Sequence, residues 1–322
     1  MTTVAHAPIT AAELTAARER ISGWVLRTPM IRLKVADTPT EIYLKLESLQ
    51  PIGAFKLRGA ASRILRMSNE ERATGVWTAS SGNMARAVAW CARELGIPCT
   101  VVIPEDGSPA KIAAVQRLGA QVVPVARPEF YEILVGRSHD GMAGAFVHPF
   151  SDRDVMAGNG TIGLEIAEDL PDVDIVLAGY GGGGLTCGIA SALRTVAPGA
   201  SVIACEPETA APLASAWRAG HPVQSSYTSS FVDGAGAGRL YPEMWELARA
   251  LLAGSETVPL QEVRYAIGLL AQSNAIVAEG AGALSVAAAL RRPPEAGKIC
   301  CVVSGGNIDA AVLAAILEEE RA

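Results

Sequence analysis

The sequence predicts an α/β protein whose doubly wound, mainly parallel sheets are covered by helices on both faces. Three runs, CTVVIP, DIVLAG and KICCVVS, support this prediction because each stays apolar over several residues without polar alternation. A strand of that composition is buried on both faces, as strands of parallel sheets are. Segments with helical periodicity separate the runs, which is the pattern of strands joined by crossover helices.

We divide this alternation into two units, at residues 76–151 and 152–322. The first should contain strands and helices at 75–80, 84–96, 99–104, 108–119 and 120–126. The second should contain helices at 161–170, 185–196, 262–274 and 281–292, strands at 174–179, 200–207 and 298–304, and a terminal helix. Residues 1–75 are too few for a core of their own, so we expect them to pack with the second unit. The polar, glycine-rich stretch at 225–238 is predicted to be a long loop.

Composition and charge exclude several classes of function. Half of the 322 residues are hydrophobic, and 27 basic against 33 acidic residues give a net charge of −6. A nucleic-acid-binding surface would need a basic excess, and no apolar run is long enough to cross a membrane. The N-terminus does not resemble a signal peptide, and the six scattered cysteines fit reduced thiols, so we expect a cytoplasmic protein. The four histidines are widely spaced and predict no metal site.

The strongest local signal is GYGGGGLTCG, at residues 179–188. It follows a predicted strand and opens a predicted helix, so its backbone N–H groups and the positive end of the helix face one point. This arrangement predicts a phosphate-binding loop. A turn needed only for helix packing is the alternative, but four consecutive glycines exceed that need. Residues 179–184 also match G-x-G-x-x-G, with Glu206 closing the next strand, which leaves a dinucleotide-binding module open.

Two further stretches lie where a predicted strand ends. SSGNMARA, at residues 80–87, begins a helix whose first amides can hold an anion such as a carboxylate, with Ser80 or Ser81 as the cap. VVSGGNID, at residues 302–309, ends a buried strand in a serine and two glycines, at the edge where open α/β sheets bind ligands. Each stretch also fits an ordinary capped helix or strand-to-helix turn.

Lys56 stands in PIGAFKLRGA, directly after Phe55 and between two glycines, where a helix is expected to begin. Apolar surroundings lower the pKa of a lysine amine from its usual value of about 10.4 and favour a Schiff base with an aldehyde. A solvated surface lysine is the ordinary alternative. An amine, a phosphate loop, an anion-binding helix start and a strand-end serine together have one economical explanation, which is pyridoxal phosphate (PLP).

The chain resembles the fold-type II PLP enzymes, whose fold is like that of the tryptophan synthase β chain, and among them the threonine/serine dehydratase and serine racemase family. The resemblance covers nearly the whole chain through GAFKLRGA, SSGNMARA, GNGTIGLEI, GGGGL and SGGN. It implies a large cofactor-binding domain, residues 1–75 plus 152–322, and a small domain, residues 76–151. The implied enzyme is a homodimer that dehydrates and deaminates a β-hydroxy amino acid such as threonine or serine to a 2-oxo acid and ammonia. A racemase or a β-replacement synthase stays open, whereas a dinucleotide-binding module explains only one motif.

The resemblance also implies a role for individual residues. Lys56 would form the Schiff base and remove the α-proton, Phe55 would line the cofactor ring, and Asn83 would hydrogen-bond the 3-oxygen of the ring. The other implied cofactor contacts are Gly181, Gly182, Gly183, Gly184 and Leu185 at the phosphate, Ser304 at the ring nitrogen, and Glu279 near the ring. The implied substrate contacts are Ser80, Ser81, Gly82, Asn83, Met84 and Arg137, with Ser81 on the face opposite Lys56.

The sequence departs from the family's pattern beside the expected carboxylate site. Met84 replaces the histidine of the usual Ser-Ser-Gly-Asn-His, and Arg86 stands where relatives often have glutamine, so the identity of the substrate is left open. Relatives that bind a divalent cation use a glutamate, a backbone carbonyl and an aspartate in the segment matching CEPETAAP. Glu206 matches the glutamate, but Pro212 stands at the aspartate position, so no metal site is predicted.

Overall fold

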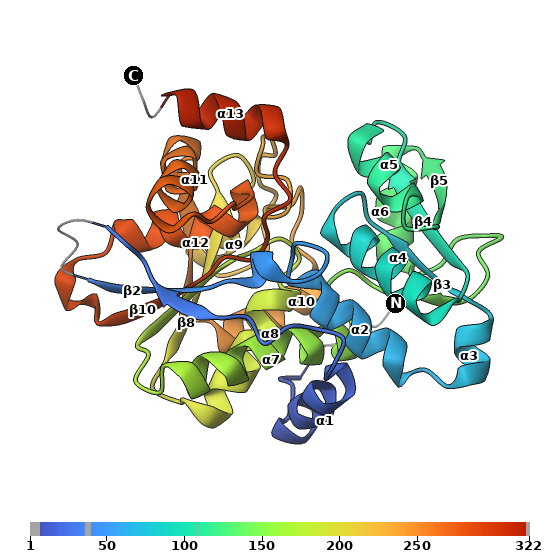
Figure 1. Ribbon diagram of the computed structural model, residues 1–322, viewed down its shortest axis with the longest axis horizontal. Coiled ribbons are helices and arrows are strands. Elements are labelled where there is room, and N and C mark those ends of the chain that lie inside the picture. The colour runs from blue at the N-terminus through green and yellow to red at the C-terminus, as the bar shows by residue number, and fades with distance from the viewer. Residues whose placement is uncertain (1–6, 36–39, 108, 320–322) are drawn as a thin grey trace.

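The computed structural model describes residues 7–35, 40–107 and 109–319, and within them the strands form two sheets (Figure 1). The larger sheet has the order β1–β2–β10–β7–β8–β9, and only the pairing of β1 with β2 is antiparallel in this described part. The apolar run at its centre forms β10, in which Cys301 lies between Leu44 of β2 and Leu177 of β7. The strands are β1 (Met30–Arg32), β2 (Glu41–Lys45), β7 (Ile175–Gly179), β8 (Ser201–Pro207), β9 (Gly254–Val258) and β10 (Lys298–Val302).

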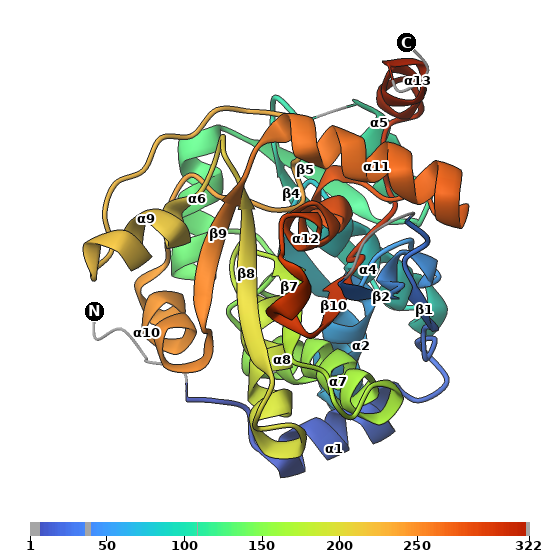
Figure 2. The ribbon, with the colours of Figure 1, turned by 90° about the vertical axis from the view of Figure 1, so that its left-hand side faces the viewer.

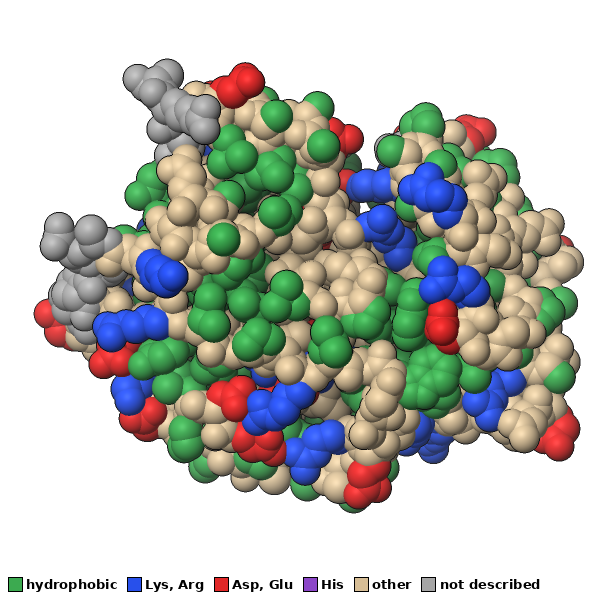
Figure 3. All heavy atoms as spheres, viewed as in Figure 1, with side chains coloured by type: hydrophobic (Ala, Val, Ile, Leu, Met, Phe, Trp, Pro, Cys, Tyr) green, Lys and Arg blue, Asp and Glu red, His purple; other side chains and the backbone are tan. Residues whose placement is uncertain are grey.

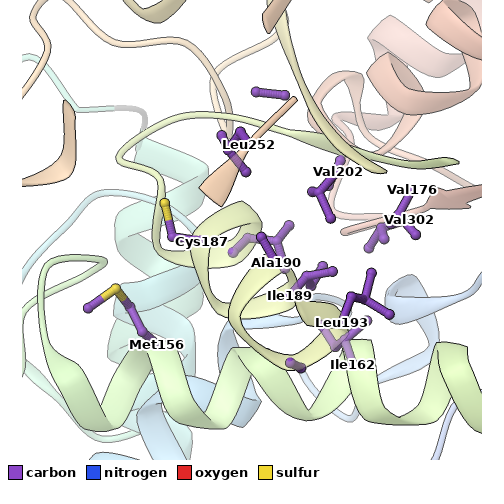
Figure 4. Close-up of a cluster of buried hydrophobic side chains, with 14 of the residues drawn as sticks. Met156, Ile162, Val176, Cys187, Ile189, Ala190, Leu193, Val202, Leu252 and Val302 are labelled. Carbon is purple, nitrogen blue, oxygen red and sulfur yellow. The ribbon is translucent and has the colours of Figure 1, made fainter. Parts of the chain in front are cut away.

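Helices cover both faces of this sheet (Figure 2). One face packs against α7 and α8, whose apolar side chains meet Val176, Val202 and Val302 of the strands (Figure 4). The other face packs against α11 and α12. The helices of this large lobe are α1 (Ala11–Ile21), α7 (Arg153–Asp169), α8 (Gly184–Val196), α9 (Pro212–Ala219), α10 (Pro242–Leu251), α11 (Leu260–Asn274), α12 (Gly280–Leu290) and α13 (Ala310–Glu319), with the 3-10 turns η1 (Glu47–Leu49) and η2 (Pro294–Ala296).

The smaller sheet has the order β5–β4–β3–β6 and is parallel at every pairing of the described strands. Apolar side chains of α4 and α5 pack on one of its faces, and those of α6 pack on the other. The elements of this small lobe are β3 (Val76–Ala79), β4 (Cys99–Pro104), β5 (Gln121–Val125), β6 (Ala145–Phe146), α4 (Asn83–Leu95), α5 (Pro109–Gln116) and α6 (Arg127–Gly136).

The helix α2 (Lys56–Arg66) lies where the two lobes meet, because it packs on α7 of the large lobe and on α4 of the small lobe. The short helix α3 (Asn69–Ala73) then leads into β3, and a capping box between Ser68 and Glu71 fixes its start. The first residue of α2 is Lys56, so the chain begins a helix where the sequence predicted one. This junction places Lys56 between the two sheets.

The predicted fold class is confirmed: helices cover both faces of two mainly parallel sheets. The strands of the small sheet lie within residues 76–151, and those of the large sheet lie outside that range. The domain boundaries at 75/76 and 151/152 remain a prediction. No helix in the described part of the chain is both long enough and apolar enough to span a membrane.

Candidate active site

A cavity lies at the carboxyl ends of β7 and β10, where ligands bind in open α/β sheets. It brings together four motifs that are far apart in the sequence: the segment before α2, the glycine loop before α8, the turn after β10, and the loop that contains Gly234. Its walls are formed by Phe55, Lys56, Phe150, Gly179, Gly181, Gly182, Gly183, Gly184, Leu185, Gly234, Ala235, Ala281 and Ser304.

The glycine loop is shaped by close contact with Phe150. A Cβ atom built on Gly182 would lie 2.1 Å from Cγ of Phe150, and one built on Gly184 would lie 2.6 Å from the Phe150 carbonyl oxygen. Gly183 adopts φ 88° and is the N-cap of α8. The amides of the first turn of α8 have no acceptor within the helix, and they lie at the end of the helix that borders the cavity. The loop therefore has the backbone donors and the positive helix end that a phosphate group requires.

Lys56 also lines this cavity. Its Nζ donates a hydrogen bond to the Pro149 carbonyl at 2.7 Å and lies 5.0 Å from the centroid of the Phe55 ring. Burial lowers the pKa of Lys56 to about 8, against the opposing effect of the Glu279 charge. Roughly a tenth of such amines are neutral at pH 7, compared with fewer than one in a thousand for an ordinary lysine. The lowered pKa therefore favours the neutral amine that a Schiff base needs.

A chain of hydrogen bonds joins the start of α4 to the large lobe. Asn83 Nδ2 donates to Oε1 of Glu279 at 2.6 Å, and Asn307 Nδ2 donates to Oδ1 of Asn83 at 2.8 Å and to the Ile52 carbonyl at 2.9 Å. Burial first, and then the charge of Asp233, raise the pKa of Glu279 to about 7. These hydrogen bonds link the segments that contain Asn83, Glu279 and Asn307 across the junction between the lobes.

The turn after β10 is tied directly to the segment before Lys56. Phe55 N donates to the Ser304 carbonyl at 2.9 Å, and Ala54 forms an isolated antiparallel bridge with Gly305. Ser304 is buried and lines the same cavity as Lys56. This places a neutral hydroxyl on the wall formed by the strand end.

The Ser-Ser-Gly-Asn turn differs from its predicted form in one respect. Gly82 is the N-cap of α4 and supplies no side-chain cap, whereas Ser80 Oγ accepts from the Gly82 amide at 3.2 Å. The prediction that Ser80 or Ser81 caps the helix was therefore wrong, because Ser80 closes a local turn before the helix begins. Met84 is 1% exposed and packs with Leu57 in the apolar contact between α2 and α4.

The family model described as a pyridoxal-phosphate dependent enzyme matches residues 21–305. The chain belongs to this family. It is 38% identical over 316 residues to the L-threonine ammonia-lyase of Thermotoga maritima, covering 97% of this chain and 79% of that protein. The structure of maize serine racemase superposes with a TM-score of 0.88 at 29% identity, covering 98% of both chains. The structure of a threonine deaminase from T.th. gives 0.84 at 34% identity, covering 93% of this chain and 99% of the other.

These findings confirm the family, the fold and the cofactor that the motifs predicted. The residues present also fit PLP, because Gly182, Gly183 and Gly184 leave no room for side chains beside the free amides, and a lysine amine with a lowered pKa lines the same cavity. The roles that the sequence assigned to single residues remain predictions.

The predicted substrate contacts of this PLP enzyme, in the turn at 80–84 and at Arg137, are not among the residues that line the cavity around Lys56. Arg137 ends α6 in the left-handed conformation, φ 56°, and donates to Ser151 Oγ at 2.9 Å. Arg86 lines a separate hollow between the lobes together with Arg117 and Asn307. Figure 3 shows the surface hollowed at the junction of the two lobes, with basic side chains on the small lobe. Substrate binding by Arg137 remains a prediction.

The carboxylate of Glu206 is held by protein donors. It accepts hydrogen bonds from the amides of Leu213 and Ala214 at 3.0 and 2.7 Å, at the start of α9, and from Ser255 Oγ at 2.9 Å. Burial raises its pKa to about 7. Among the described residues no group of three or more His, Cys, Asp or Glu side chains could hold a metal ion. Glu206 therefore serves as the cap that the start of α9 otherwise lacks.

Several residues that line the cavity or bond to its residues were missed by the sequence reasoning. Asn307 belongs to the SGGN motif, yet nothing in the sequence shows that its amide reaches Asn83. Pro149 contributes a backbone carbonyl, which carries no signal of residue type. Gly234 and Ala235 belong to the loop at 225–238, whose glycine content was the available signal.

Proposed function

We propose that this enzyme removes water from a β-hydroxy amino acid, threonine or serine, and releases a 2-oxo acid and ammonia. The observation that carries the proposal is the neutral hydroxyl of Ser304 on the wall of the cavity that holds the amine of Lys56. The names of the relatives, threonine ammonia-lyase and threonine deaminase, agree with this choice.

When bound, PLP supplies an electron sink that makes the α-hydrogen of an amino acid acidic. The glycine loop and the Leu185 amide would hold the phosphate, Phe55 would line the ring, and Asn83 would hydrogen-bond the ring oxygen. Lys56 would hold the cofactor through its amine and would accept the α-proton at Nζ. The turn from Ser80 to Gly82 and the backbone amides of Asn83 and Met84 at the start of α4 would receive the substrate carboxylate, and Arg137 would approach the substrate from the end of α6.

The partner of the ring nitrogen decides how long negative charge persists on the substrate. Ser304 has no charge, so it does not hold a proton on that nitrogen as an aspartate would. A neutral partner would stabilise negative charge at the α-carbon less than an aspartate would, so prompt loss of the β-hydroxyl would be favoured. Together with the α-proton accepted by Lys56, this hydroxyl accounts for one water. The resulting enamine would hydrolyse to the 2-oxo acid and ammonia. One water is released in the elimination and one is taken up in the hydrolysis, so there is no net change in water.

Racemisation is a second candidate activity, and Ser81 favours it. Ser81 lies half-buried on the small lobe directly before α4, whereas Lys56 lies at the start of α2. A hydroxyl on the opposite face from Lys56 can return a proton to the α-carbon. The likeness to maize serine racemase supports the same activity.

The direct test is an assay of the purified enzyme with the L and D forms of threonine and serine. We expect 2-oxo acid and ammonia in equal amounts from the L forms, and none from a Lys56→Ala variant. Formation of ammonia without 2-oxo acid, or full activity in that variant, would refute the proposal. Loss of D-substrate use alone in Ser81→Ala would assign racemisation to Ser81.

We further propose that the enzyme is a cytoplasmic homodimer. Leu26, Leu49 and Val277 are each about half exposed, at 51%, 49% and 47%. Leu26 is paired through its backbone with Gln50, next to Leu49. Exposed apolar side chains grouped in this way favour association. Sedimentation of the parent and a Leu49→Glu variant should give a dimer and a monomer, respectively.

A further inference from the structure

The side chain of Arg58, two residues after Lys56, is fully buried, and all three of its guanidinium nitrogens donate hydrogen bonds. Its Nε and NH2 donate to the two oxygens of Glu47, each at 2.8 Å. Its NH1 and NH2 donate to the two oxygens of Glu165 at 2.6 and 2.9 Å. Thr161 Oγ1 and the Leu26 carbonyl accept further bonds, both at 3.1 Å. Two forked contacts of this kind fix the guanidinium plane as well as its place.

Lys45 completes a buried charge cluster with Glu47, Arg58 and Glu165. Its Nζ lies 2.7 Å from Oε2 of Glu165 and donates to the Thr28 carbonyl at 2.7 Å. The cluster contains two cations and two carboxylates, contributed by β2, η1, α2 and α7. Removing such charges from water costs about as much as their attraction returns, and well-packed apolar side chains are often no less stable. A gain in the stability of the fold therefore does not explain why this cluster is built from charged side chains.

The backbone of Arg58 is clamped as tightly as its side chain. A Cβ atom built on Gly158 of α7 would lie only 2.3 Å from the Arg58 carbonyl oxygen, so the two helices touch at backbone level. The N-cap of α2, Phe55, supplies no side-chain cap, although its amide is held by the Ser304 carbonyl. The first turn of α2 thus depends on Arg58 for its side-chain anchor.

Residues two apart on an α-helix point to nearly opposite faces, because each residue turns the helix by about 100°. Lys56 accordingly faces the cofactor cavity, while Arg58 faces β2, η1 and α7. A rotation or shift of α2 would move both side chains together. Fixing the guanidinium on one face therefore fixes the amine on the other.

We propose that the buried charge cluster is a positioning device for Lys56, with Arg58 as its central residue. It sets the rotation and depth of the first turn of α2 so that Nζ reaches the cofactor. This inference rests on the proposed role of Lys56 as the residue that carries the cofactor. Reactive groups tolerate little displacement, since a shift of about 1 Å can cost on the order of 100-fold in rate.

The test compares three variants. Arg58→Met removes the central residue and leaves buried carboxylates unpaired. A quadruple variant, K45M/E47L/R58M/E165M, removes two charges of each sign and fills the space with apolar groups. Arg66→Met is the matched control, because Arg66 lies on the same helix but pairs with Asp154 at the surface, with 57% of its side chain exposed. Each is examined for cooperative unfolding, visible absorbance with PLP, kcat and KM for L-threonine, and the pH dependence of reductive methylation of Lys56 after removal of the cofactor.

We expect the quadruple variant to fold cooperatively and to lose kcat on the order of 100-fold, with KM changed less. Its Lys56 methylation curve should move toward higher pH, and Arg66→Met should match the parent in every measurement. A folded quadruple variant with the parent's methylation curve and kcat would overturn the inference. Failure of the quadruple variant to fold would also overturn it, because the cluster would then be needed for stability. If the parent enzyme showed no visible absorbance with PLP, the proposed function would be refuted instead. The methylation curve is measured without the cofactor, so it tests the position of Lys56 independently.

Discussion

Glu279 is the residue whose protonation links the active site to the stability of the fold. Its carboxyl group is buried beside Asn83, and its pKa is raised to about 7 from an ordinary value near 4.5. The folded chain therefore binds more protons than the unfolded chain between these two pH values. The contribution of Glu279 to the free energy of unfolding therefore falls as the pH rises from about 4.5 to about 7. Glu206, with its pKa also raised to about 7, acts in the same direction.

Glu279→Gln should remove the first of these two contributions. The difference in unfolding free energy between variant and parent should shift in favour of the variant as the pH rises through this window, and should stay constant above it. Thermal unfolding of the cofactor-free proteins from pH 4.5 to 8 measures this difference. Glu132→Gln, at an exposed glutamate, serves as the control and should follow the parent. A pH-independent difference for Glu279→Gln would contradict the assignment.

Ser304 is the residue on which the choice of reaction depends. Ser304→Asp would place a carboxylate where we propose that the ring nitrogen lies, and would keep that nitrogen protonated. We expect PLP to bind still, elimination from L-threonine to slow by about tenfold or more, and a long-wavelength intermediate to accumulate. Stopped-flow absorbance and steady-state assays measure both effects. Parent-like turnover without a new band would show that Ser304 does not face the ring nitrogen.

Contact with Phe150, and not glycine content alone, determines the shape of the loop before α8. Gly182→Ala would push a methyl group against the Phe150 ring, 2.1 Å from Cγ. Overpacking of this kind costs about 1–3 kcal/mol, and we expect PLP affinity to fall by about tenfold or more. Gly199→Ala is the control, because nothing lies within 4 Å of the added Cβ. Equal PLP affinities in a spectroscopic titration of both variants would exclude a strict shape requirement at Gly182.

The sequence predicted those elements whose signal is local. The largely apolar runs CTVVIP, DIVLAG and KICCVVS form β4, β7 and β10, and Lys56 begins a helix as expected. The segment GSETV, which forms β9, is polar enough to give no strand signal, and its pairing with β8 at the edge of the sheet decides its conformation. The N-cap of α4 was misplaced because both serines and Gly82 are acceptable caps, and only the local turn at Ser80 decides among them.

The whole molecule assembles the site from contacts that no local pattern encodes. Asn83 and Glu279 are 196 residues apart in the chain, and their hydrogen bond forms because α4 of the small lobe meets α12 of the large lobe. An ion pair between Lys111 and Asp233, and Arg239 stacked 5.1 Å over the Tyr131 ring, join the lobes on the side of the long loop. The motifs predicted which residues belong to the site, and the junction of the lobes decides how they are paired.

The assignment on which the others rest is that Lys56, and no other lysine, carries PLP in the cavity at the carboxyl ends of β7 and β10. Reduction of the holoenzyme with borohydride, followed by digestion and mass spectrometry, tests it most directly. We expect one pyridoxyl group per chain, on the peptide containing Lys56, and a loss of L-threonine turnover in proportion to labelling. A pyridoxyl group on another lysine such as Lys45 or Lys111, or full turnover after complete labelling, would contradict it.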